Sequence, residues 1–546
     1  MAQFDLGDDG VVVIIGSGAG GGTVANELAQ KGIKSVVLEA GKRFGLEDIE
    51  NDEWAMFNKI SWLDKRHSAG GWHGAVNHPT LPTWIVKGFG GSTVHWAGVA
   101  LRFKEYEFKT RTTYGAIDGA NVEDWPVDLA EMTPWYEKAE LKMGVTGKTT
   151  GMPHLPWNNG FRVLAEGCRR TGRSDYNSGP MAINSVERDG RPACQQIGFC
   201  MQGCAIGAKW STMTTELPRA EATGNCEIRT DCMALRIEHD AAGKVTGVVY
   251  ADKDGNQQLQ KARVVCVAGN TIESPRLLLN SASPMYPDGL ANSSGQVGKN
   301  YMTHTTGGVY AAMPEKVHMF RGTSVAGIVG DEVHHDASRG FSGGYYLEFL
   351  SLGLPFMAAF LEPGNTGWGR SVSRALESYD RMSGVWVLGE DLAQERNAIT
   401  LHDSETDQYG LPVPIVSKTP HNNDYAMTAH MYETSAQIYE AVGATDVYEL
   451  PSYPASHNMG TNRMHADRAK GVVNGRVAYL VEIPDLRPPG CVMVGRVRPR
   501  GQGFWRQLAE TGSPTRRLFA SRSDPMPSAP RTAWAPFRRR VARSGS

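Results

Sequence analysis

Cysteines are few in this sequence, and long apolar runs are missing. Eight cysteines are dispersed through 546 residues, unlike the dense cysteine framework of small secreted domains. No apolar stretch reaches the roughly 18 to 20 residues that span a bilayer. The acidic start, Met1 to Asp9, lacks the basic and apolar parts of a signal peptide. We therefore expect no transmembrane segment, and a cytoplasmic location unless a partner subunit carries the chain elsewhere.

Lysine is absent from the last sixty residues. Positions 487–546 contain thirteen arginines and two acids, Glu510 and Asp524, so this tail carries about +11 in a chain whose net charge is −2. Arginine-rich arms often bind nucleic acid. Aromatic residues are sparse among these arginines, however, so we do not expect nucleic acid as a partner.

The rest of the composition is typical of a globular protein with more than one domain. Hydrophobic residues make up 41% of the chain and charged residues 21%. A length of 546 residues exceeds a single hydrophobic core, so we expect two intertwined domains.

The clearest motif is a glycine-rich turn near the N-terminus. Five β-forming residues at 11–15 predict a buried parallel strand, and a helix is expected over 23–31. Between them, Gly16, Gly18 and Gly21 allow a tight turn and close approach of the backbone to a pyrophosphate at the helix N-terminus. This pattern is typical of dinucleotide binding.

An acidic residue follows at the expected distance. A second strand is predicted at 35–38, and it ends on Glu39, whose carboxylate can accept both ribose hydroxyls of an adenosine. Strand, turn, helix, strand and acid in this order predict a dinucleotide-binding unit.

Further segments distinguish FAD from NAD. They are the second glycine-rich turn Gly88–Gly98, the strand and helix start over Val264–Leu279, and the stretch Ser456–Met464, which reads Ser-His-Asn-Met-Gly-Thr-Asn-Arg-Met. With these segments the chain resembles the glucose–methanol–choline (GMC) family of FAD-dependent oxidoreductases over about residues 10 to 475.

The resemblance implies an α/β fold in which a Rossmann-type FAD-binding domain carries an inserted substrate domain built on an antiparallel sheet. It also implies that Gly90, Gly91, Ser92 and Thr93 wrap the far side of the FAD pyrophosphate, and that Gly269 lies beside the flavin. The predicted parts are an FAD-binding domain at 8–310 that resumes at 450–486, a substrate domain at 311–449, and a divergent Arg- and Pro-rich tail at 487–546.

Strand-like segments separated by turns support the inserted domain. We expect an antiparallel sheet above the flavin from four of them. They are 307–313, 343–350, 383–389 and 398–401.

His457 is the predicted catalytic base. Oxidation of an alcohol requires a base that accepts the hydroxyl proton near neutral pH while hydride leaves for the flavin, and imidazole suits this task. The resemblance places the family's active-site histidine at His457, in the context of Gly460 and Thr461.

Two interpretations stay open for His95. In several members of the family, the histidine at this place in the Gly-Gly-Ser-Thr-x-His pattern is covalently bonded to the 8α-methyl group of the flavin. The alternative is a histidine that packs against the flavin without a covalent bond.

Three cysteines form a cluster in the sequence. Cys194, Cys200 and Cys204 have the spacing C-x5-C-x3-C, and thiolates are suitable ligands for iron–sulfur clusters. The spacing is similar to that of the GMC subunits of bacterial sugar dehydrogenases, which hold a three-iron, four-sulfur cluster. Free buried thiols are the alternative, and no fourth ligand indicates zinc.

The resemblance stops near Asn474. The family continues with a helix whose Asn or His is the second catalytic residue, whereas this chain becomes rich in arginine and proline. A frameshift in the coding sequence explains the lost match, the arginine excess and the missing lysine together. We therefore assign no second catalytic residue.

The sequence thus predicts an FAD-dependent dehydrogenase that oxidises the CH–OH group of a small alcohol, polyol or sugar. Electrons would pass to a quinone, haem or dye acceptor, and the resemblance implies a small subunit and a haem subunit as partners in a periplasmic, membrane-associated complex. An alcohol oxidase that uses oxygen and a non-catalytic flavin-binding subunit are the alternatives.

Overall fold

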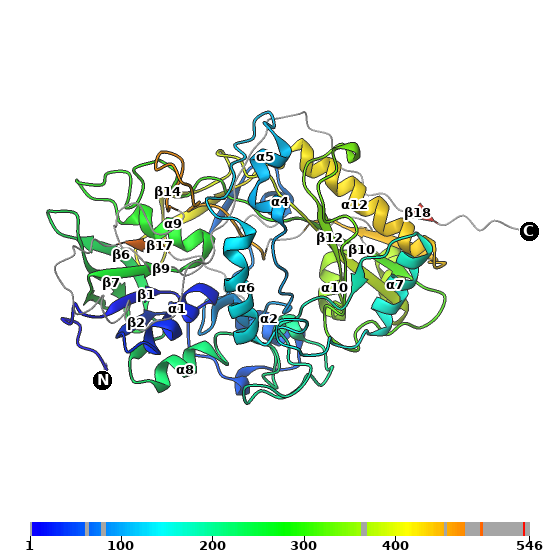
Figure 1. Cartoon of the computed structure of the whole chain (residues 1–546), viewed down its shortest axis with the longest axis horizontal. Helices are drawn as coiled ribbons and strands as arrows, with labels where there is room; N and C mark the ends of the chain where they lie inside the picture. The colour runs from blue at the N-terminus through cyan, green and yellow to red at the C-terminus, as the bar shows by residue number, and fades with distance from the viewer. Residues whose placement is uncertain are drawn as a thin grey trace, which may run out of the picture.

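The computed structural model describes residues 3–60, 65–77, 83–361, 369–452, 456–474, 492–494 and 539–540. Two β-sheets occupy opposite ends of an elongated molecule, and helices cover both (Figure 1). The parallel sheet, near the N-terminus in Figure 1, positions the glycine turns. The antiparallel sheet lies at the other end.

The first sheet has five strands in the order β17-β9-β1-β2-β5. Their bounds are β1 (Val12–Ile15), β2 (Ser35–Leu38), β5 (Cys226–Arg229), β9 (Val264–Val267) and β17 (Val492–Val494). β1 pairs in parallel with both β2 and β9. All four side chains of β1 are buried, because one face packs on α1 (Ala19–Ala29) and the other on a small antiparallel sheet.

The helix α1 begins four residues earlier than the sequence predicted. It starts at Ala19 rather than at position 23, and the three glycines at 20–22 belong to its first turn. Glycine has a low helix propensity, so the sequence did not predict this first turn as helical. The close packing of α1 explains the glycines: a Cβ at Gly22 would lie 2.8 Å from the side chain of Thr212.

The remaining elements at this end of the molecule surround the parallel sheet. They are the three antiparallel strands β6 (Met233–His239), β7 (Val245–Ala251) and β8 (Gln257–Lys261), the helices α8 (Glu216–Ala222) and α9 (Asn270–Asn280), and the 3-10 turns η2 (Gly91–Val94) and η3 (Cys200–Gln202).

The second large sheet is antiparallel, with the order β18-β16-β10-β13-β12-β11-β4. Its strands are β4 (Tyr176–Asn177), β10 (Thr305–Ala312), β11 (Ile328–Val329), β12 (Tyr345–Phe349), β13 (Met382–Gly389), β16 (Asp446–Leu450) and β18 (Arg539–Arg540). The helices α7 (Asn159–Arg170) and α12 (Asn422–Glu440) pack on one face of this sheet (Figure 1). The predicted fold class, a Rossmann-type parallel sheet combined with an antiparallel substrate sheet, is confirmed.

One sequence prediction about this sheet is wrong. The segment 398–401 belongs to β14 (Ala398–Thr406), which joins β15 (Pro412–Ser417) and β3 (His67–Ala69) in a separate three-stranded sheet. Alternation of apolar residues identifies a strand but not the sheet that it joins, because the choice of partner depends on contacts distant in sequence.

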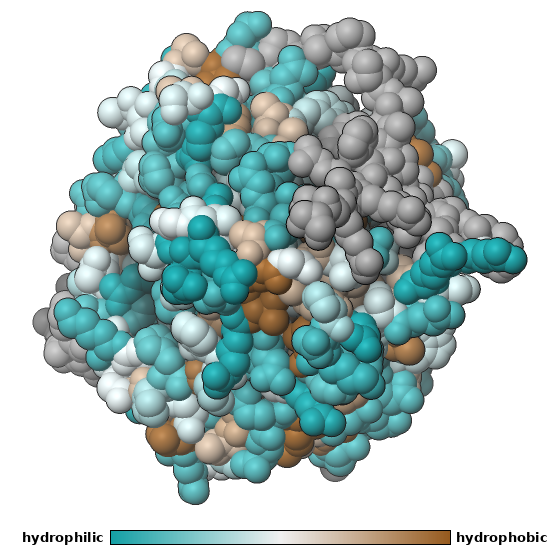
Figure 2. Space-filling view, turned by 90° about the vertical axis from the view of Figure 1, so that its right-hand side faces the viewer, coloured by the Kyte–Doolittle hydropathy of each residue, from teal (hydrophilic) through white to brown (hydrophobic). Residues whose placement is uncertain are grey.

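The other α-helices of the described residues lie in the segments between these strands. They are α2 (Glu53–Ile60), α3 (His73–Asn77), α4 (Glu105–Phe108), α5 (Thr110–Tyr114), α6 (Leu129–Met143), α10 (Leu354–Leu361) and α11 (Arg370–Glu377). Within the described ranges, no helix combines the length and the apolar character needed to cross a bilayer. Figure 2 shows the end of the molecule at the right of Figure 1, where hydrophilic residues surround small separate apolar patches.

Candidate functional site

The first glycine turn joins β1 to α1 and leaves no room for side chains. Gly16 has a φ of +96°, and a Cβ there would lie 2.6 Å from the carbonyl oxygen of Ala268. A Cβ at Gly21 would lie 1.9 Å from the carbonyl oxygen of Gly16. Gly18 is the N-cap of α1 and is extended. A pyrophosphate can therefore approach the N-terminal backbone of this helix closely.

Glu39 follows β2 and contacts the same turn. Its carboxylate accepts hydrogen bonds from the Ser17 amide (3.0 Å), the Ser17 hydroxyl (2.6 Å) and the Gly41 amide (2.9 Å). Burial raises the pKa of Glu39, and these hydrogen bonds oppose the rise. Glu39 thus lies at the carboxyl end of β2, the edge of the sheet at which nucleotides bind in such folds.

The second glycine turn packs directly against the first. Gly90 and Gly91 have φ angles of +101° and +52°, and a Cβ at Gly91 would lie 2.8 Å from the Cα atom of Gly18. The Thr212 hydroxyl lies 2.9 Å from the Ser17 carbonyl oxygen and 3.2 Å from that of Gly90. The two turns therefore form one backbone cradle that any side chain at Gly91 would fill.

The other predicted cofactor-binding residues border this cradle. Thr93 donates a hydrogen bond to the Gly90 carbonyl oxygen at 2.6 Å, and this bond closes the second turn. The Ser92 side chain is exposed. Gly269 is the N-cap of α9, next to the carboxyl end of β9.

His457 lies on a loop that is held against two other segments. Gly460 has a φ of +84°, and a Cβ there would lie 1.7 Å from the carbonyl oxygen of Asn300. The Thr461 hydroxyl donates to the carbonyl oxygen of Thr271 at 2.7 Å. The Gly-Thr pair therefore fixes the loop between the segment before β10 and the start of α9.

The ring of His457 meets the ring of a second histidine, His304. Their centroids are 5.0 Å apart, and the planes are at 77°. Burial among protein atoms lowers the pKa of His457 to about 3, with a smaller contribution from His304. The side chain of His457 is nevertheless exposed to solvent. Its imidazole is neutral at pH 7 and able to accept a proton.

His304 is neutral for the same reason. Burial lowers its pKa to about 4, although the hydrogen bond between Nδ1 and the Gly389 carbonyl oxygen (3.3 Å) opposes this effect. In the neutral ring, Nδ1 must carry the proton in order to donate to that carbonyl. The Nε2 atom of His304 then keeps a free lone pair.

His95 packs flat on Trp84, with ring centroids 5.2 Å apart and planes at 15°. Burial lowers the pKa of His95 to about 3, and the nearby Lys209 and His457 lower it further. The Nε2 atom of His95 is buried and has no hydrogen-bond partner among the residues that the structure describes. His95, His304 and His457 are therefore all neutral imidazoles at pH 7.

Lys209 connects the His95 loop to the cysteine loop. Its Nζ atom donates to the carbonyl oxygens of Val94 (2.9 Å), Trp96 and Cys200 (2.6 Å). Lys209 is 2% exposed, and burial lowers its pKa to about 8. The carbonyl groups on both sides of His95 are thus held at a fixed distance from the Cys200 backbone.

The three clustered cysteines share a hydrogen-bonding pattern. Each sulfur accepts a backbone N–H: Gln196 donates to Cys194 (3.4 Å), Ser324 to Cys200 (3.5 Å), and Lys209 to Cys204 (3.5 Å). Burial raises the pKa of Cys194 to about 11, and the other two thiols contribute to that rise. Backbone N–H donors at each sulfur are a common way to stabilise cluster-bound thiolates.

The geometry around these sulfurs does not fit a single metal ion. In the described ranges, the only three His, Cys, Asp or Glu ligand atoms that lie within 4.8 Å of one another belong to a different group. A cluster holds its ligand sulfurs farther apart than one zinc ion does. All three cysteines are free, as are Cys168, Cys226 and Cys232, whereas Cys266 is disulfide-bonded.

Comparison with known proteins identifies the family. Residues 7–306 match the family profile described as GMC oxidoreductase. The chain belongs to the GMC oxidoreductase family. It is 31% identical to the 2-methyl-1,2-propanediol dehydrogenase of Mycolicibacterium austroafricanum, over 85% of this chain and 87% of the relative.

Other GMC relatives carry different substrate names. The chain is 28% identical to the fructose dehydrogenase large subunit of Gluconobacter japonicus, with 85% of this chain and 89% of the relative covered. It is 29% identical to paromamine 6'-oxidase of Streptomyces fradiae, with 85% and 83% covered. The solved structure of pyridoxine 4-oxidase from Mesorbium loti shares the fold, with a TM-score of 0.56 at 16% identity over 85% of this chain and 91% of that one.

As a GMC oxidoreductase, the protein is an FAD-binding enzyme that acts on the CH–OH group of a small molecule. The backbone cradle at Gly18 and Gly91 fits a pyrophosphate, since the two turns meet where neither has a side chain. Sequence reasoning missed two residues of this site. His304 and Lys209 lay within segments that matched the family, but only the folded chain brings them to His457 and His95.

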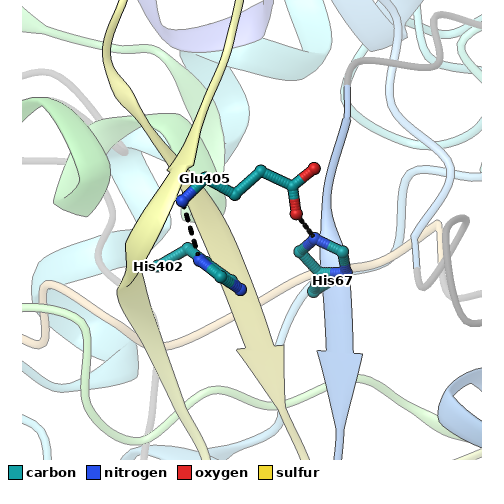
Figure 3. A group of neighbouring side chains, drawn as sticks. All are labelled: His67, His402 and Glu405. Carbon is teal, nitrogen blue, oxygen red and sulfur yellow. Dashed lines mark hydrogen bonds and ion pairs between the residues drawn. The ribbon is translucent and has the colours of Figure 1, made fainter.

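A separate group of side chains joins β3 to β14 (Figure 3). The His67 Nε2 atom contacts the Glu405 carboxylate, which also pairs with Lys65, and the rings of His67 and His402 lie 5.0 Å apart. The Nδ1 atom of His402 accepts the Glu405 amide at 3.0 Å. Because these groups already have protein partners, we interpret them as a polar junction between the two strands.

Proposed function

We propose that this GMC oxidoreductase is a dehydrogenase that oxidises an alcohol, polyol or sugar to a carbonyl compound, with His457 as the catalytic base. The observation that carries this proposal is a neutral, solvent-exposed imidazole on a loop that Gly460 and Thr461 fix in place. A neutral imidazole keeps the lone pair that a base needs in order to accept a hydroxyl proton.

His304 is the proposed partner of this base. Both imidazoles are neutral at pH 7, as their low pKa values indicate, so His304 would not keep a proton from His457 and serves instead to orient the substrate hydroxyl group. The ring of His304 is the neighbour at 5.0 Å, and the lone pair on its Nε2 atom is available. His304 therefore takes the part of the second catalytic residue that the sequence left unassigned.

The cofactor-binding residues follow from the same geometry. Gly16, Gly18 and Gly21 would hold the pyrophosphate together with the turn that contains Gly90 to Thr93, because these two turns meet. Glu39 would bind the ribose, and Gly269 at the start of α9 would contact the flavin. When bound, FAD supplies the acceptor for the hydrogen on the substrate carbon.

His95 is proposed as the site of covalent flavin attachment. Its Nε2 atom has no protein partner in the described part of the chain, and its ring is neutral, so a lone pair is free for bonding. Acid precipitation separates this proposal from noncovalent packing. A covalent flavin stays with the pellet, whereas a packed flavin is released into the supernatant.

An iron–sulfur cluster at Cys194, Cys200 and Cys204 is the proposed route for electrons. Three thiols on one loop, each with a backbone N–H donor, suit a three-iron, four-sulfur cluster. Such a cluster transfers single electrons to a haem or quinone acceptor. One relative is named as a large subunit, and we propose that this chain likewise associates with a small subunit and a haem subunit.

The second candidate is an alcohol oxidase. Two relatives that cover most of the chain, paromamine 6'-oxidase and 6'''-hydroxyparomomycin C oxidase, are named oxidases. The decisive experiment mixes purified yellow protein with alcohols, polyols and sugars, first without oxygen and then in air with or without a dye. Dye reduction without peroxide supports the dehydrogenase, and peroxide equal to the alcohol consumed supports the oxidase. A flavin spectrum that no compound changes would contradict both.

A further inference from the structure

The two proposed catalytic histidines lie opposite each other because their segments pair. Met302 and Met459 form an antiparallel bridge, and their backbones exchange hydrogen bonds of 3.0 and 2.9 Å. Two residues beyond this bridge, the antiparallel register places His304 opposite His457, and their rings meet there. Any group that fixes the segment 301–304 therefore sets the position of His304 against the base.

Thr303, the residue before His304, is held by an ion pair. The Oδ2 atom of Asp391 accepts the Thr303 amide at 2.9 Å and lies 2.7 Å from the ammonium group of Lys418. The same ammonium group donates to the Thr303 hydroxyl oxygen at 2.6 Å. The backbone and the side chain of Thr303 are thus bound to one anion and one cation, which also bind each other.

This ion pair lies deep in the protein. The side chains of Lys418 and Asp391 are 8% and 0% exposed, and Thr303 is 3% exposed. Apolar residues of similar volume often give equal or greater stability at such a depth, so stability alone does not explain two buried charges. Hydrogen bonds from charged groups are directional, however, and they fix the Thr303 backbone in one orientation.

Separate parts of the fold supply the two charges. Asp391 follows β13, and the carbonyl oxygen of Gly389 at the end of that strand accepts a hydrogen bond from the Nδ1 atom of His304 at 3.3 Å. Lys418 follows β15, and its amide donates to the carbonyl oxygen of Ala69 on β3 at 3.0 Å. His304 is therefore anchored at its ring and at the preceding residue by two different sheets.

The ammonium group of Lys418 also acts on the ring of His304. Burial is the main cause of the low pKa of His304, and the charge of Lys418 lowers this pKa further. The other titratable groups that face the ion pair are Asp424, His421 and Tyr301. Burial shifts the pKa of each of these three toward the neutral form, upward for Asp424 and Tyr301 and downward for His421.

We propose that Lys418 and Asp391 are positioning residues of the reaction, because their ion pair fixes Thr303 and thereby holds the His304 ring where it orients the substrate hydroxyl group toward His457. The inference rests on the proposed function, which gives His304 that task. Neither charged group touches the substrate or the reacting atoms. Misplacement of a reacting group by about 1 Å can cost roughly 100-fold in rate, and this sets the scale of the expected effect.

The test is a mutant cycle on the flavin-loaded full-length chain. The rate of anaerobic flavin reduction is measured at a saturating concentration of the alcohol, polyol or sugar that reduces the wild type fastest. Lys418→Met should lower this rate by about 10- to 100-fold in the wild type. In the His304→Ala background the same substitution should change the rate by less than about twofold, because no ring remains to be positioned.

Two further variants control for general loss of stability. Arg276→Met breaks another buried ion pair, which joins α9 to the β14–β15 turn through Asp407 at 2.7 Å, and it should not reproduce the rate loss. Thr303→Val keeps the Lys418–Asp391 pair and removes only the hydroxyl group, so it decides the question if Lys418→Met does not fold. It should slow flavin reduction in the wild type but not in His304→Ala.

The proposal is overturned if folded Lys418→Met keeps the wild-type rate. It is also overturned if Lys418→Met or Thr303→Val slows the reaction by the same factor with and without His304, because a merely structural role predicts equal factors.

Denaturant unfolding separates this inference from the proposed function. Lys418→Met and Thr303→Val together should lose less free energy of unfolding than the sum of their separate losses, because both remove the same hydrogen bond. Additive losses would overturn the contact on which the inference depends. If no compound reduces the flavin while the losses are non-additive, the proposed function fails and the hold on Thr303 stands.

Discussion

Lys209 donates a hydrogen bond to the Cys200 carbonyl oxygen at 2.6 Å. The same ammonium group holds the carbonyl oxygens of Val94 and Trp96, which flank His95. One buried ammonium group therefore binds both the cysteine loop and the backbone on each side of His95. This side chain links the loops of the two proposed redox sites.

Replacing Lys209 by Met should destabilise the protein strongly. Three buried carbonyl oxygens lose their donor, and a single unsatisfied buried group already costs about 1 to 3 kcal/mol. We expect a loss of at least about 3 kcal/mol in the free energy of unfolding, measured by denaturant titration. Lys253→Met, at an exposed lysine in the β7–β8 turn, is the control and should change little. An unchanged denaturant midpoint for Lys209→Met would show that these hydrogen bonds contribute nothing to the stability of the protein.

Replacing His457 by Ala should slow the reaction without loss of the cofactor. General base catalysis is worth about 10²- to 10⁴-fold, so the rate of anaerobic flavin reduction by alcohol should fall by that factor. The bound flavin, measured from its absorbance per protein, should stay at the wild-type level. His334→Ala, at an exposed histidine, provides the comparison. Wild-type reduction rates in His457→Ala would remove this residue from the base role.

A substitution at Gly91 should abolish cofactor binding. In Gly91→Ala the new Cβ lies 2.8 Å from the Cα atom of Gly18 and closes the cradle. Gly255→Ala is a matched control, because Gly255 also has a positive φ (+82°) but no atom within 4 Å of the added Cβ. We expect purified Gly91→Ala to be colourless and Gly255→Ala to be yellow. Equal flavin contents in the two variants would refute a cradle at this position.

The cysteine cluster predicts the metal content. Protein prepared without oxygen should contain about three irons per flavin, and Cys200→Ser should lose this iron while the flavin remains. Cys232→Ser removes a buried thiol elsewhere and should keep the iron. Iron analysis near zero in the wild type would exclude the cluster and favour the oxidase.

Acid should destabilise the enzyme between pH 6.5 and 4. The pKa values of His95 and His304 in the folded chain are about 3 and about 4, below the value near 6.5 in the unfolded chain. In this window the unfolded state binds more protons, so the stabilisation is complete above pH 6.5 and is lost as the pH falls. His304→Asn should reduce the slope of unfolding free energy against pH by up to about 1.4 kcal/mol per unit. A slope equal to that of the wild type would mean that His304 is not buried in its neutral form.

The local parts of the site could be predicted from the sequence. The strand, glycine turn and Glu39 lie within thirty residues of each other, and their spacing alone dictates how they fold. The predicted start of α1 was wrong because three glycines, which have a low helix propensity, form its first turn. The predicted sheet of segment 398–401 was wrong because strand pairing depends on residues that are distant in the sequence.

The remainder of the site required the folded chain. The contact between His304 and His457 joins positions 153 residues apart in the numbering of the sequence, and no pattern in either segment indicates it. The predicted tail at 487–546 lies outside the described residues, except for β17 and β18.

The arrangement of the parallel sheet also dictates when the enzyme can fold during its synthesis. β1 lies between β2 and β9, and β9 ends at Val267, more than 250 residues after the start of β1. At about 5 to 20 residues per second, the ribosome needs roughly 13 to 50 seconds to supply the missing neighbour. During that interval the apolar strand Val12–Ile15 lacks its hydrogen-bonding partner β9 along one edge. Nascent chains of this enzyme should therefore be clients of ribosome-associated chaperones until β9 emerges.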